Sequence, residues 1–189
     1  MVEKPMVKPI VLASSSPRRR ELFALLDLPF QAVDPQVDES PFELEKPKST
    51  ALRLASAKAQ EAARSHPDAI IVAADTLVIL GENILGKPRD RAEAVAILEA
   101  LRGKKHRVTS GVIVLAGATG EKREEVAETQ VWMRAYSEEE IARYIGRGEP
   151  FDKAGGYAIQ DKEFRPVARV KGCYANVMGL PLCHLYRAL

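Results

Sequence analysis

The spacing of hydrophobic positions along the chain changes repeatedly between the period of a strand and the period of a helix. Apolar or alternating runs predict strands at residues 10–13, 69–80, 106–117, 125–136, 154–160 and 168–177, and one within 30–41 that leads into an acidic loop. Apolar residues three or four apart predict helices at residues 17–26, 49–65, 91–101, 137–145 and 180–189. Because these elements do not alternate strictly, we expect an α/β fold around a mixed, twisted sheet with flanking helices.

Capping and turn residues agree with several of these boundaries. Ser16 is suited to the N-cap of the first helix, and Pro17 is suited to its first turn. Ser137 and Glu140 have the spacing of a capping box at the start of another helix. Residues 118–122 have the composition of a hairpin turn between two strands. The residues between the predicted elements therefore support their order.

Composition limits the classes of protein to which the chain can belong. We expect its 189 residues, 1–189, to form a single domain. A net charge of +2 and an aromatic fraction of 6% argue against stable nucleic-acid binding and against a membrane surface. No apolar run has the length of a membrane span or of a signal peptide, so we expect a cytoplasmic protein. Cys173 and Cys183 lack the spacing of a zinc site, and we expect both to be buried, reduced thiols.

The segment 12–22, LASSSPRRREL, runs from a strand through three serines into a helix that begins with arginines. The first N–H groups of a helix have no partner within it, and together with serine hydroxyls they can bind an anion. Adjacent arginines at this end repel one another and oppose the helix dipole, so a bound anion would relieve both effects. The alternative is a capped surface helix with a solvated basic end, which this segment alone supports about equally.

The helical period separates the roles of the three arginines. The core face of this helix is assigned to its leucines, Leu22, Leu25 and Leu26. At about 100° per residue, Arg18 and Arg19 flank this face and can reach over the edge of the sheet, whereas Arg20 points away from it. Guanidinium groups suit phosphate oxygens, so we expect Arg18 and Arg19 to bind phosphate and Arg20 to be solvated.

Two lysines extend this cationic group. Lys58 lies at the border of the small-residue face of the helix at 49–65, from which its side chain could reach the edge of the sheet. Lys87 lies between Gly86 and Pro88, where the backbone is constrained. A solvated helical lysine at position 58 and a turn lysine at position 87 are the alternatives.

Asp75 is a single carboxylate inside the apolar segment 69–80. Burial of an unpaired carboxylate is costly, so Asp75 needs a metal, a lysine or backbone donors as its partner. The segment exceeds the usual length of a strand, and we expect a break at residues 74–76 that places Asp75 at a strand end. A structural aspartate bound by backbone N–H groups is the alternative. Asp38 and Glu39 supply further carboxylates, unless they belong to an exposed loop.

Serine, arginine and lysine donors beside one or two carboxylates fit metal-assisted chemistry on a polyphosphate. In such a site a metal neutralises phosphate charge, and a carboxylate holds the metal or accepts the proton of a water molecule. With these residues in place, the chain resembles the Maf (septum formation) family of nucleotide pyrophosphatases from about Ile10 to its C-terminus. The resemblance rests on seven motifs in order: LASSSPRR, VDE, RLASAKA, AADT, GKPRD, DKAGGYAIQ and NVMGLPL.

The resemblance implies a fold similar to that of the inosine-triphosphate pyrophosphatases, with a cleft between two lobes and often a homodimer. It implies hydrolysis of a nucleoside triphosphate substrate between the α and β phosphates, with a divalent metal, Mg²⁺ or Mn²⁺, as cofactor. By position, Asp75 matches the catalytic acceptor, and Glu39 and Asp75 are the acidic residues expected at the metal. The phosphate-contacting positions of the family are matched by Ser14, Arg19, Lys58 and Lys87.

Arg18, Thr76 and Gln160 match the branch of this family that acts on dTTP and UTP. The branch that acts on 7-methyl-GTP usually has an aromatic residue after the proline, Asp-Gln in place of Asp-Thr, and no such later glutamine. Ser15 replaces a glycine that is commoner in the serine loop. The resemblance therefore implies hydrolysis of dTTP and UTP, or of modified pyrimidine nucleotides, which would limit incorporation of non-canonical nucleotides.

Two functions of other classes are alternatives. A nucleotide-binding regulator of cell division with little turnover would share the phosphate site, but binding alone would not require carboxylates beside a polyanion. A basic nucleic-acid-binding module is disfavoured by the small net charge and the few aromatic residues. An assay of pyrophosphate release separates the enzyme from both.

Overall fold

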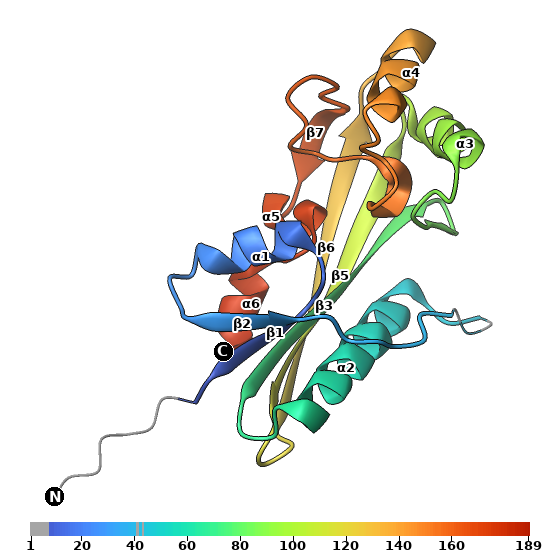
Figure 1. Ribbon diagram of the computed structural model, residues 1–189. Coiled ribbons are helices and arrows are strands. Elements are labelled where there is room, and N and C mark those ends of the chain that lie inside the picture. The colour runs from blue at the N-terminus through green and yellow to red at the C-terminus, as the bar shows by residue number, and fades with distance from the viewer. Residues whose placement is uncertain (1–7, 41, 43) are drawn as a thin grey trace, which may run out of the picture.

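The computed structural model describes residues 8–40, 42 and 44–189, which form a seven-stranded sheet with helices on both faces (Figure 1). The strands are β1 (Ile10–Ala13), β2 (Phe30–Val33), β3 (Ile70–Leu80), β4 (Asn83–Leu85), β5 (Lys105–Ala116), β6 (Lys122–Met133) and β7 (Val167–Lys171). The helices are α1 (Pro17–Ala24), α2 (Pro47–Ser65), α3 (Arg91–Leu101), α4 (Glu138–Gly146), the 3₁₀ helix η1 (Ala154–Gly156), α5 (Tyr174–Met178) and α6 (Leu182–Ala188). The acidic loop predicted after β2 ends at Pro41, outside the described residues.

The sheet has the order β2-β1-β3-β5-β6-β7, with β4 paired to β3. β1 lies parallel to β2 and β3, whereas β3, β5, β6 and β7 are antiparallel neighbours, so the predicted mixed sheet is confirmed. β1 ends at Ala13, opposite Ala73 in the middle of β3, and β4 pairs with β3 only from Val78 onward. Among the described strands, residues 74–77 of β3 therefore have a neighbour on the β5 side alone. We call these residues the β3 notch.

The predicted break in the strand at 74–76 is wrong. β3 runs without interruption because it pairs with β5 from Ile70 to Ile79, and Asp75 lies opposite Gly111 within this ladder. Asp75 nevertheless lies beside the C-terminal end of a parallel strand, because β1 stops two positions earlier in the register. The end of the neighbouring strand, and not a break in β3, therefore creates the crevice that is expected at the edge of an α/β sheet.

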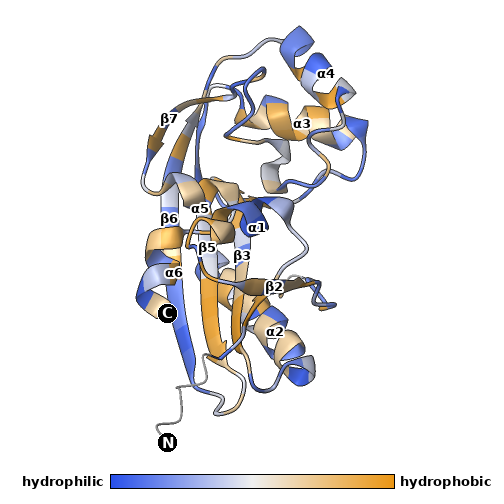
Figure 2. Ribbon diagram, turned by 60° about the vertical axis from the view of Figure 1, so that its left-hand side comes forward, coloured by the Kyte–Doolittle hydropathy of each residue, from blue (hydrophilic) through white to orange (hydrophobic). Residues whose placement is uncertain are grey.

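Three groups of buried side chains hold the helices to the sheet. At the end of the sheet that contains β1, alanines of α2 cover one face and pack against Ile71 and Ala73. Phe23 of α1 and Leu185 of α6 pack on the opposite face with Val72. α3 and α4 pack against the far end of the sheet, beyond the β3 notch. The long strands β3, β5 and β6 thus join two lobes (Figure 1), and the central strands β3 and β5 carry long hydrophobic stretches (Figure 2).

Two strands predicted near the C-terminus are wrong in whole or in part. Residues 154–160 form η1 and turns, because Gly155 and Gly156 take φ values of 71° and 65°, which do not occur in a strand. The segment 168–177 divides at Gly172, where φ is 129°, into β7 and α5. In both segments glycine permits a turn that the hydrophobic pattern alone does not indicate.

Two positions that were predicted to be buried are exposed. The side chain of Leu25 is 72% exposed, and Phe23 takes its place on the core face of α1. Cys183 is exposed and Cys173 is half-buried, so the prediction of two buried thiols is wrong. Within the described part of the chain, none of the helices combines the length and the apolar composition that crossing a membrane requires.

Candidate active site

Two adjoining cavities lie beside the β3 notch. The larger has a volume of about 530 Å³ and is lined by residues of both lobes. The smaller has a volume of about 180 Å³ and is lined by the serine loop, residues 14–16, and by residues that follow β2. Four cationic side chains line both cavities: Arg18, Arg19, Lys58 and Lys87. The structure thus brings the four predicted phosphate-binding cations together around the two cavities.

Lys58 contacts both of the predicted site carboxylates. Its side chain extends from α2, is 10% exposed, and places Nζ 2.6 Å from Asp75 Oδ1 and 2.6 Å from Glu39 Oε1. Asp75 is 7% exposed, whereas Glu39 lies on an exposed loop after β2. Partial burial would raise the pKa of Glu39, but the hydrogen bond and the charge of Lys58 hold it below its usual value. The alternative of a solvated lysine at position 58 is excluded, and a lysine is the partner that Asp75 requires.

Small residues allow α2 to bring Lys58 close to the sheet. Ala51 and Ala55 of α2 are fully buried against it. Gly111 lies opposite Asp75 on β5, and a Cβ atom at this position would lie 2.6 Å from the carbonyl carbon and oxygen of Ala51. A larger residue at position 111 would move α2 away from the sheet, because the contact is with backbone atoms. Gly111 therefore sets the distance over which Lys58 reaches Asp75.

The three consecutive arginines of α1 have different acceptors. Arg18 donates from Nη1 to Asp152 Oδ2 at 2.7 Å and from Nη2 to the Asp152 carbonyl oxygen at 3.0 Å. Arg19 is half-buried and donates from Nε to the Gly179 carbonyl oxygen at 2.8 Å. Arg20 is exposed, donates to a carbonyl oxygen of the serine loop at 3.2 Å, and lines neither cavity. The orientations predicted from the helical period therefore agree with the structure.

The serine loop supplies neutral donors to the smaller cavity. Ser14 is buried, and its Oγ accepts a hydrogen bond from the N–H of Ser16 at 3.2 Å. Ser16 occupies the N-cap of α1 as predicted, but its side chain makes no capping hydrogen bond. The first N–H groups of α1 are therefore not satisfied by a side-chain cap. Lys87 follows β4 as an exposed residue and lines the same cavity.

Thr76 faces the opposite side of β3 from Asp75, because side chains alternate along a strand. Its Oγ1 lies 2.8 Å from Ser110 Oγ and accepts a hydrogen bond from Arg19 Nη2 at 3.2 Å. The same oxygen lies 3.3 Å from the carbonyl oxygen of Gly179. Thr76 thus connects β3 and β5 with α1 and with the turn after α5, where it lines the larger cavity.

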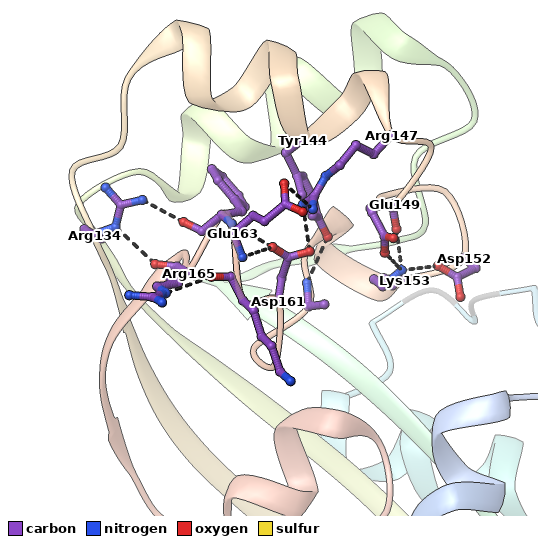
Figure 3. Close-up of polar contacts among 12 residues, drawn as sticks. Arg134, Tyr144, Arg147, Glu149, Asp152, Lys153, Asp161, Glu163 and Arg165 are labelled. Atoms are coloured by element: carbon purple, nitrogen blue, oxygen red, sulfur yellow. Dashed lines mark hydrogen bonds and ion pairs between the residues drawn. The ribbon is translucent and has the colours of Figure 1, made fainter.

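Gln160 lines the larger cavity from a turn next to Asp161, whose side chain lies near Arg147 in Figure 3. Asp161 fixes this turn, because its carboxylate accepts the N–H groups of Glu163 and Phe164 at 3.0 and 2.6 Å. Arg147, which directly follows α4, donates to the same carboxylate at 2.8 Å. The Oε1 atom of Gln160 is buried and has no hydrogen-bond partner among the described residues. A buried acceptor without a partner beside a cavity indicates a place for a donor on a ligand.

Asp152 and Lys153 also line the larger cavity, although neither is among the site residues predicted from the sequence. They lie in the turn between α4 and η1, within the quoted motif DKAGGYAIQ. An acid next to a base, just before glycines, is a common composition for an exposed turn. The local pattern therefore gave no signal that could have distinguished them from surface charges.

The site carboxylates fit a divalent cation. Within residues 8–40, 42 and 44–189, no group of three or more His, Cys, Asp or Glu side chains is arranged to hold a metal ion. Mg²⁺, however, usually binds only one or two protein carboxylates and takes its other ligands from water and substrate phosphates. Glu39 and Asp75 approach the same atom, Lys58 Nζ, so their oxygens lie near one another. This pair is suited to a cation that is shared with phosphate.

The chain is similar to several known proteins. A dTTP/UTP pyrophosphatase of Myxococcus xanthus is 49% identical over 92% of this chain and 87% of its own length. A protein of the same name from Thermomicrobium roseum is 46% identical over 95% of this chain and 82% of its own length. Another, from Carboxydothermus hydrogenoformans, is 43% identical over 95% of this chain and 96% of its own length. The Ham1 protein of Staphylococcus aureus matches in structure with a TM-score of 0.49 and 15% identity, over 68% of this chain and 73% of that chain. Residues 9–189 match the family described as Maf-like protein, and the chain therefore belongs to that family.

Proposed function

We propose that the protein is a nucleoside triphosphate pyrophosphatase that hydrolyses dTTP and UTP to the monophosphate and pyrophosphate. The names of its relatives support this substrate class. The observation that carries the chemistry is the contact of Lys58 with Asp75 and Glu39. Lys58 lines both cavities. In this proposal residues 1–189 act as one domain, and the activity limits incorporation of non-canonical nucleotides.

The two cavities suit the two parts of a nucleotide. A volume of about 530 Å³ lies in the range of small-molecule sites, roughly 300–1,000 Å³, and the larger cavity would hold the nucleoside. The triphosphate would extend from the larger cavity into the smaller one, where Arg19, Lys58 and Lys87 supply positive charges. The Ser14 hydroxyl and the first N–H groups of α1 add neutral donors. Because all nucleoside triphosphates carry the same phosphates, these contacts bind without regard to the base.

Asp75 is the proposed general base. It accepts a proton from a water molecule whose oxygen forms a bond with the α-phosphorus. The bond from this phosphorus to the α–β bridging oxygen breaks, and pyrophosphate leaves with that oxygen. Lys58 offsets the negative charge that develops on the phosphate oxygens. Glu39 and Asp75 would hold a divalent cation, Mg²⁺ or Mn²⁺, which neutralises charge on the phosphates.

Gln160 is proposed to recognise the base. Its Oε1 can accept the N3–H of uracil or thymine, and its amide N–H can donate to a neighbouring carbonyl oxygen of the base. Cytosine has no N–H at this position and would leave Oε1 without a partner. Guanine offers the same two groups on a larger ring, so the size of the cavity must reject it. Thr76 and Arg18 line the same cavity and complete the proposed preference for pyrimidines.

Measurement of pyrophosphate release from dTTP, UTP, CTP, GTP and 7-methyl-GTP, with Mg²⁺ or Mn²⁺, tests the proposal. We expect the highest kcat/KM for dTTP and UTP. Gln160→Ala should lower these two values about tenfold, as expected for one buried polar group, and leave the value for CTP nearly unchanged. One common factor for all substrates would show that Gln160 does not read the base, and a preference for 7-methyl-GTP would contradict the branch. Nucleotide binding without pyrophosphate release would instead support a regulator of cell division.

Location and assembly complete the proposal. The proposed substrates belong to the cytoplasmic nucleotide pool, and we propose that the protein acts there without a nucleic-acid or membrane partner. The family resemblance also implies a homodimer. Sedimentation velocity measures this assembly directly, and a monomer at micromolar concentration would contradict it.

A further inference from the structure

The ion pair between Arg18 and Asp152 joins the two lobes across the cavities. Arg18 lies in the first turn of α1, whereas Asp152 lies in the other lobe, between α4 and η1. The guanidinium contacts Asp152 twice, from Nη1 to Oδ2 at 2.7 Å and from Nη2 to the carbonyl oxygen at 3.0 Å. Both residues line both cavities. The pair therefore lies where the larger cavity meets the smaller one, on the path proposed for the triphosphate.

Asp152 is itself held in place before any nucleotide binds. Its Oδ1 lies 2.6 Å from Lys153 Nζ, while Oδ2 contacts Arg18. Lys153 is 8% exposed and also contacts the carbonyl oxygen and the carboxylate of Glu149 (Figure 3). Partial burial would raise the pKa of Asp152, but hydrogen bonds from Lys153 and Arg18 hold it below its usual value. The carboxylate is therefore charged and fixed between two cations, one from each lobe.

Arg18 requires such an anchor more than its neighbours do. The first turn of α1 contains no acidic residue that could offset three adjacent cations. Arg19 is held by a half-buried contact with the Gly179 carbonyl and by Thr76. Among the described residues, the side-chain hydrogen bonds of Arg18 all go to Asp152. A free arginine side chain would lose rotamer freedom on binding a nucleotide, and prior fixation removes this cost.

We propose that Asp152 is a positioning residue, whose ion pair across the cleft fixes Arg18 so that the free edge of its guanidinium faces the bound nucleotide. A guanidinium has five N–H groups, and the two contacts with Asp152 leave the others available to a ligand. The charge of Asp152 acts only through Arg18. The inference rests on the proposed function for its nucleotide, but the ion pair is a property of the free protein.

A double-mutant cycle on kcat/KM for UTP tests this role. Asp152→Asn keeps the shape and removes the charge, and we expect kcat/KM to fall about tenfold, mainly through KM. Arg18→Ala should lower it at least as much, and adding Asp152→Asn to Arg18→Ala should cause no further loss, because both changes remove the same contact. Asp152→Glu should recover most of the loss. Glu149→Gln is the matched control, because Glu149 contacts Lys153 without contacting Arg18, and it should behave as the unmodified protein does.

Amide hydrogen exchange in the free protein tests the ion pair without any nucleotide. Asp152→Asn and Arg18→Ala should each accelerate exchange at residues 153–156 about two- to fivefold, and the double variant should add nothing. Unchanged exchange in these variants, or additive losses of kcat/KM, would overturn the proposal. An increase of kcat/KM in Asp152→Asn would also overturn it, because Asp152 would then compete with phosphate for Arg18. Absence of pyrophosphate release by the unmodified protein would instead refute the proposed function, and exchange would still decide on the ion pair.

Discussion

Replacement of Asp75 by asparagine separates the chemistry of this side chain from its structural role. Asparagine keeps the shape and removes the charge, and Lys58 retains Glu39 as a carboxylate 2.6 Å from its Nζ. Weakening a hydrogen bond to a charged group lowers the free energy of unfolding by about 1–3 kcal/mol. For a chain of 189 residues this corresponds to a loss of roughly 2–12 °C in Tm. We therefore expect Asp75→Asn to fold.

The loss of turnover in this variant should exceed what instability can explain. A positioned general base contributes at least about 10²-fold to the rate, or about 2.7 kcal/mol of activation free energy. A domain with an unfolding free energy of about 5–15 kcal/mol stays almost wholly folded at 25 °C after a loss of 1–3 kcal/mol. The rate of pyrophosphate release at saturating dTTP and metal then measures the chemistry, and urea unfolding of the same sample measures the stability.

Glu39→Gln is the matched control, because it removes the other carboxylate from the same Lys58 nitrogen. The side chain of Glu39 is 53% exposed, so its loss should destabilise the protein no more than Asp75→Asn does. At saturating metal we expect kcat to stay within about tenfold of the unmodified value. Equal losses of kcat in the two variants would show that Asp75 only balances the charge of Lys58. A kcat within about tenfold of the unmodified value in Asp75→Asn would refute the general-base assignment.

Three other regions give predictions of the same kind. Arg19→Ala should lower kcat/KM about tenfold or more for every triphosphate, and Arg20→Ala should leave it nearly unchanged; equal effects would contradict the assigned orientations. Gly111→Ala should lower the unfolding free energy, measured by urea unfolding, by about 1–3 kcal/mol and reduce kcat, because the added Cβ would meet backbone atoms of α2. Gly146→Ala is the control, because position 146 has open space around it, and it should change the unfolding free energy by less than about 0.5 kcal/mol. Burial lowers the pKa of His106 from 6.5 to about 4, so below about pH 6.5 the unfolded chain binds a proton that the folded chain does not. The unfolding free energy should therefore fall by roughly 3 kcal/mol between pH 6.5 and pH 4, and a persistence of this slope in His106→Gln would assign it to other groups.

Features that depend on neighbouring residues could be predicted from the sequence. The first helix begins at Pro17 as predicted and ends two residues earlier than predicted. The capping box is present, because Ser137 Oγ accepts the N–H of Glu140 and Glu140 accepts the N–H of Ser137. The orientations of Arg18 and Arg19 follow from the helical period, although the core face of α1 includes Phe23 in place of Leu25. In each case the determining contacts lie within a few positions along the chain.

Features that depend on distant residues could not be predicted in this way. β3 stays continuous through Asp75 because β5 pairs with it across Gly111, and no property of residues 69–80 reveals that partner. Asp152 acquires its place in the site from Arg18, which lies 134 positions earlier in the chain. Lys58 likewise becomes buried only because Gly111 lets α2 approach the sheet. The sequence therefore singled out several of the charges beside the cavities, whereas Asp152, Lys153 and the pairing of the charges required the fold.

In the free protein, two of the four site cations are already paired with carboxylates. Lys58 contacts two carboxylates and Arg18 contacts Asp152, whereas Lys87 has no ion-pair partner among the described residues. A triphosphate that binds Lys58 must therefore exchange contacts with carboxylates for new ones, whereas Arg18 keeps Asp152 and offers its remaining N–H groups. Arg19, like Lys87, has no ion-pair partner among the described residues. At Lys58 the net gain in the ground state is small, because each new contact replaces an old one. The transition state places more charge on the leaving bridging oxygen and gains more from the same cations. Ion pairs between the cations and carboxylates of the free site therefore favour turnover over tight binding of the nucleotide. This is a physical reason to prefer an enzyme to a protein that only binds nucleotides.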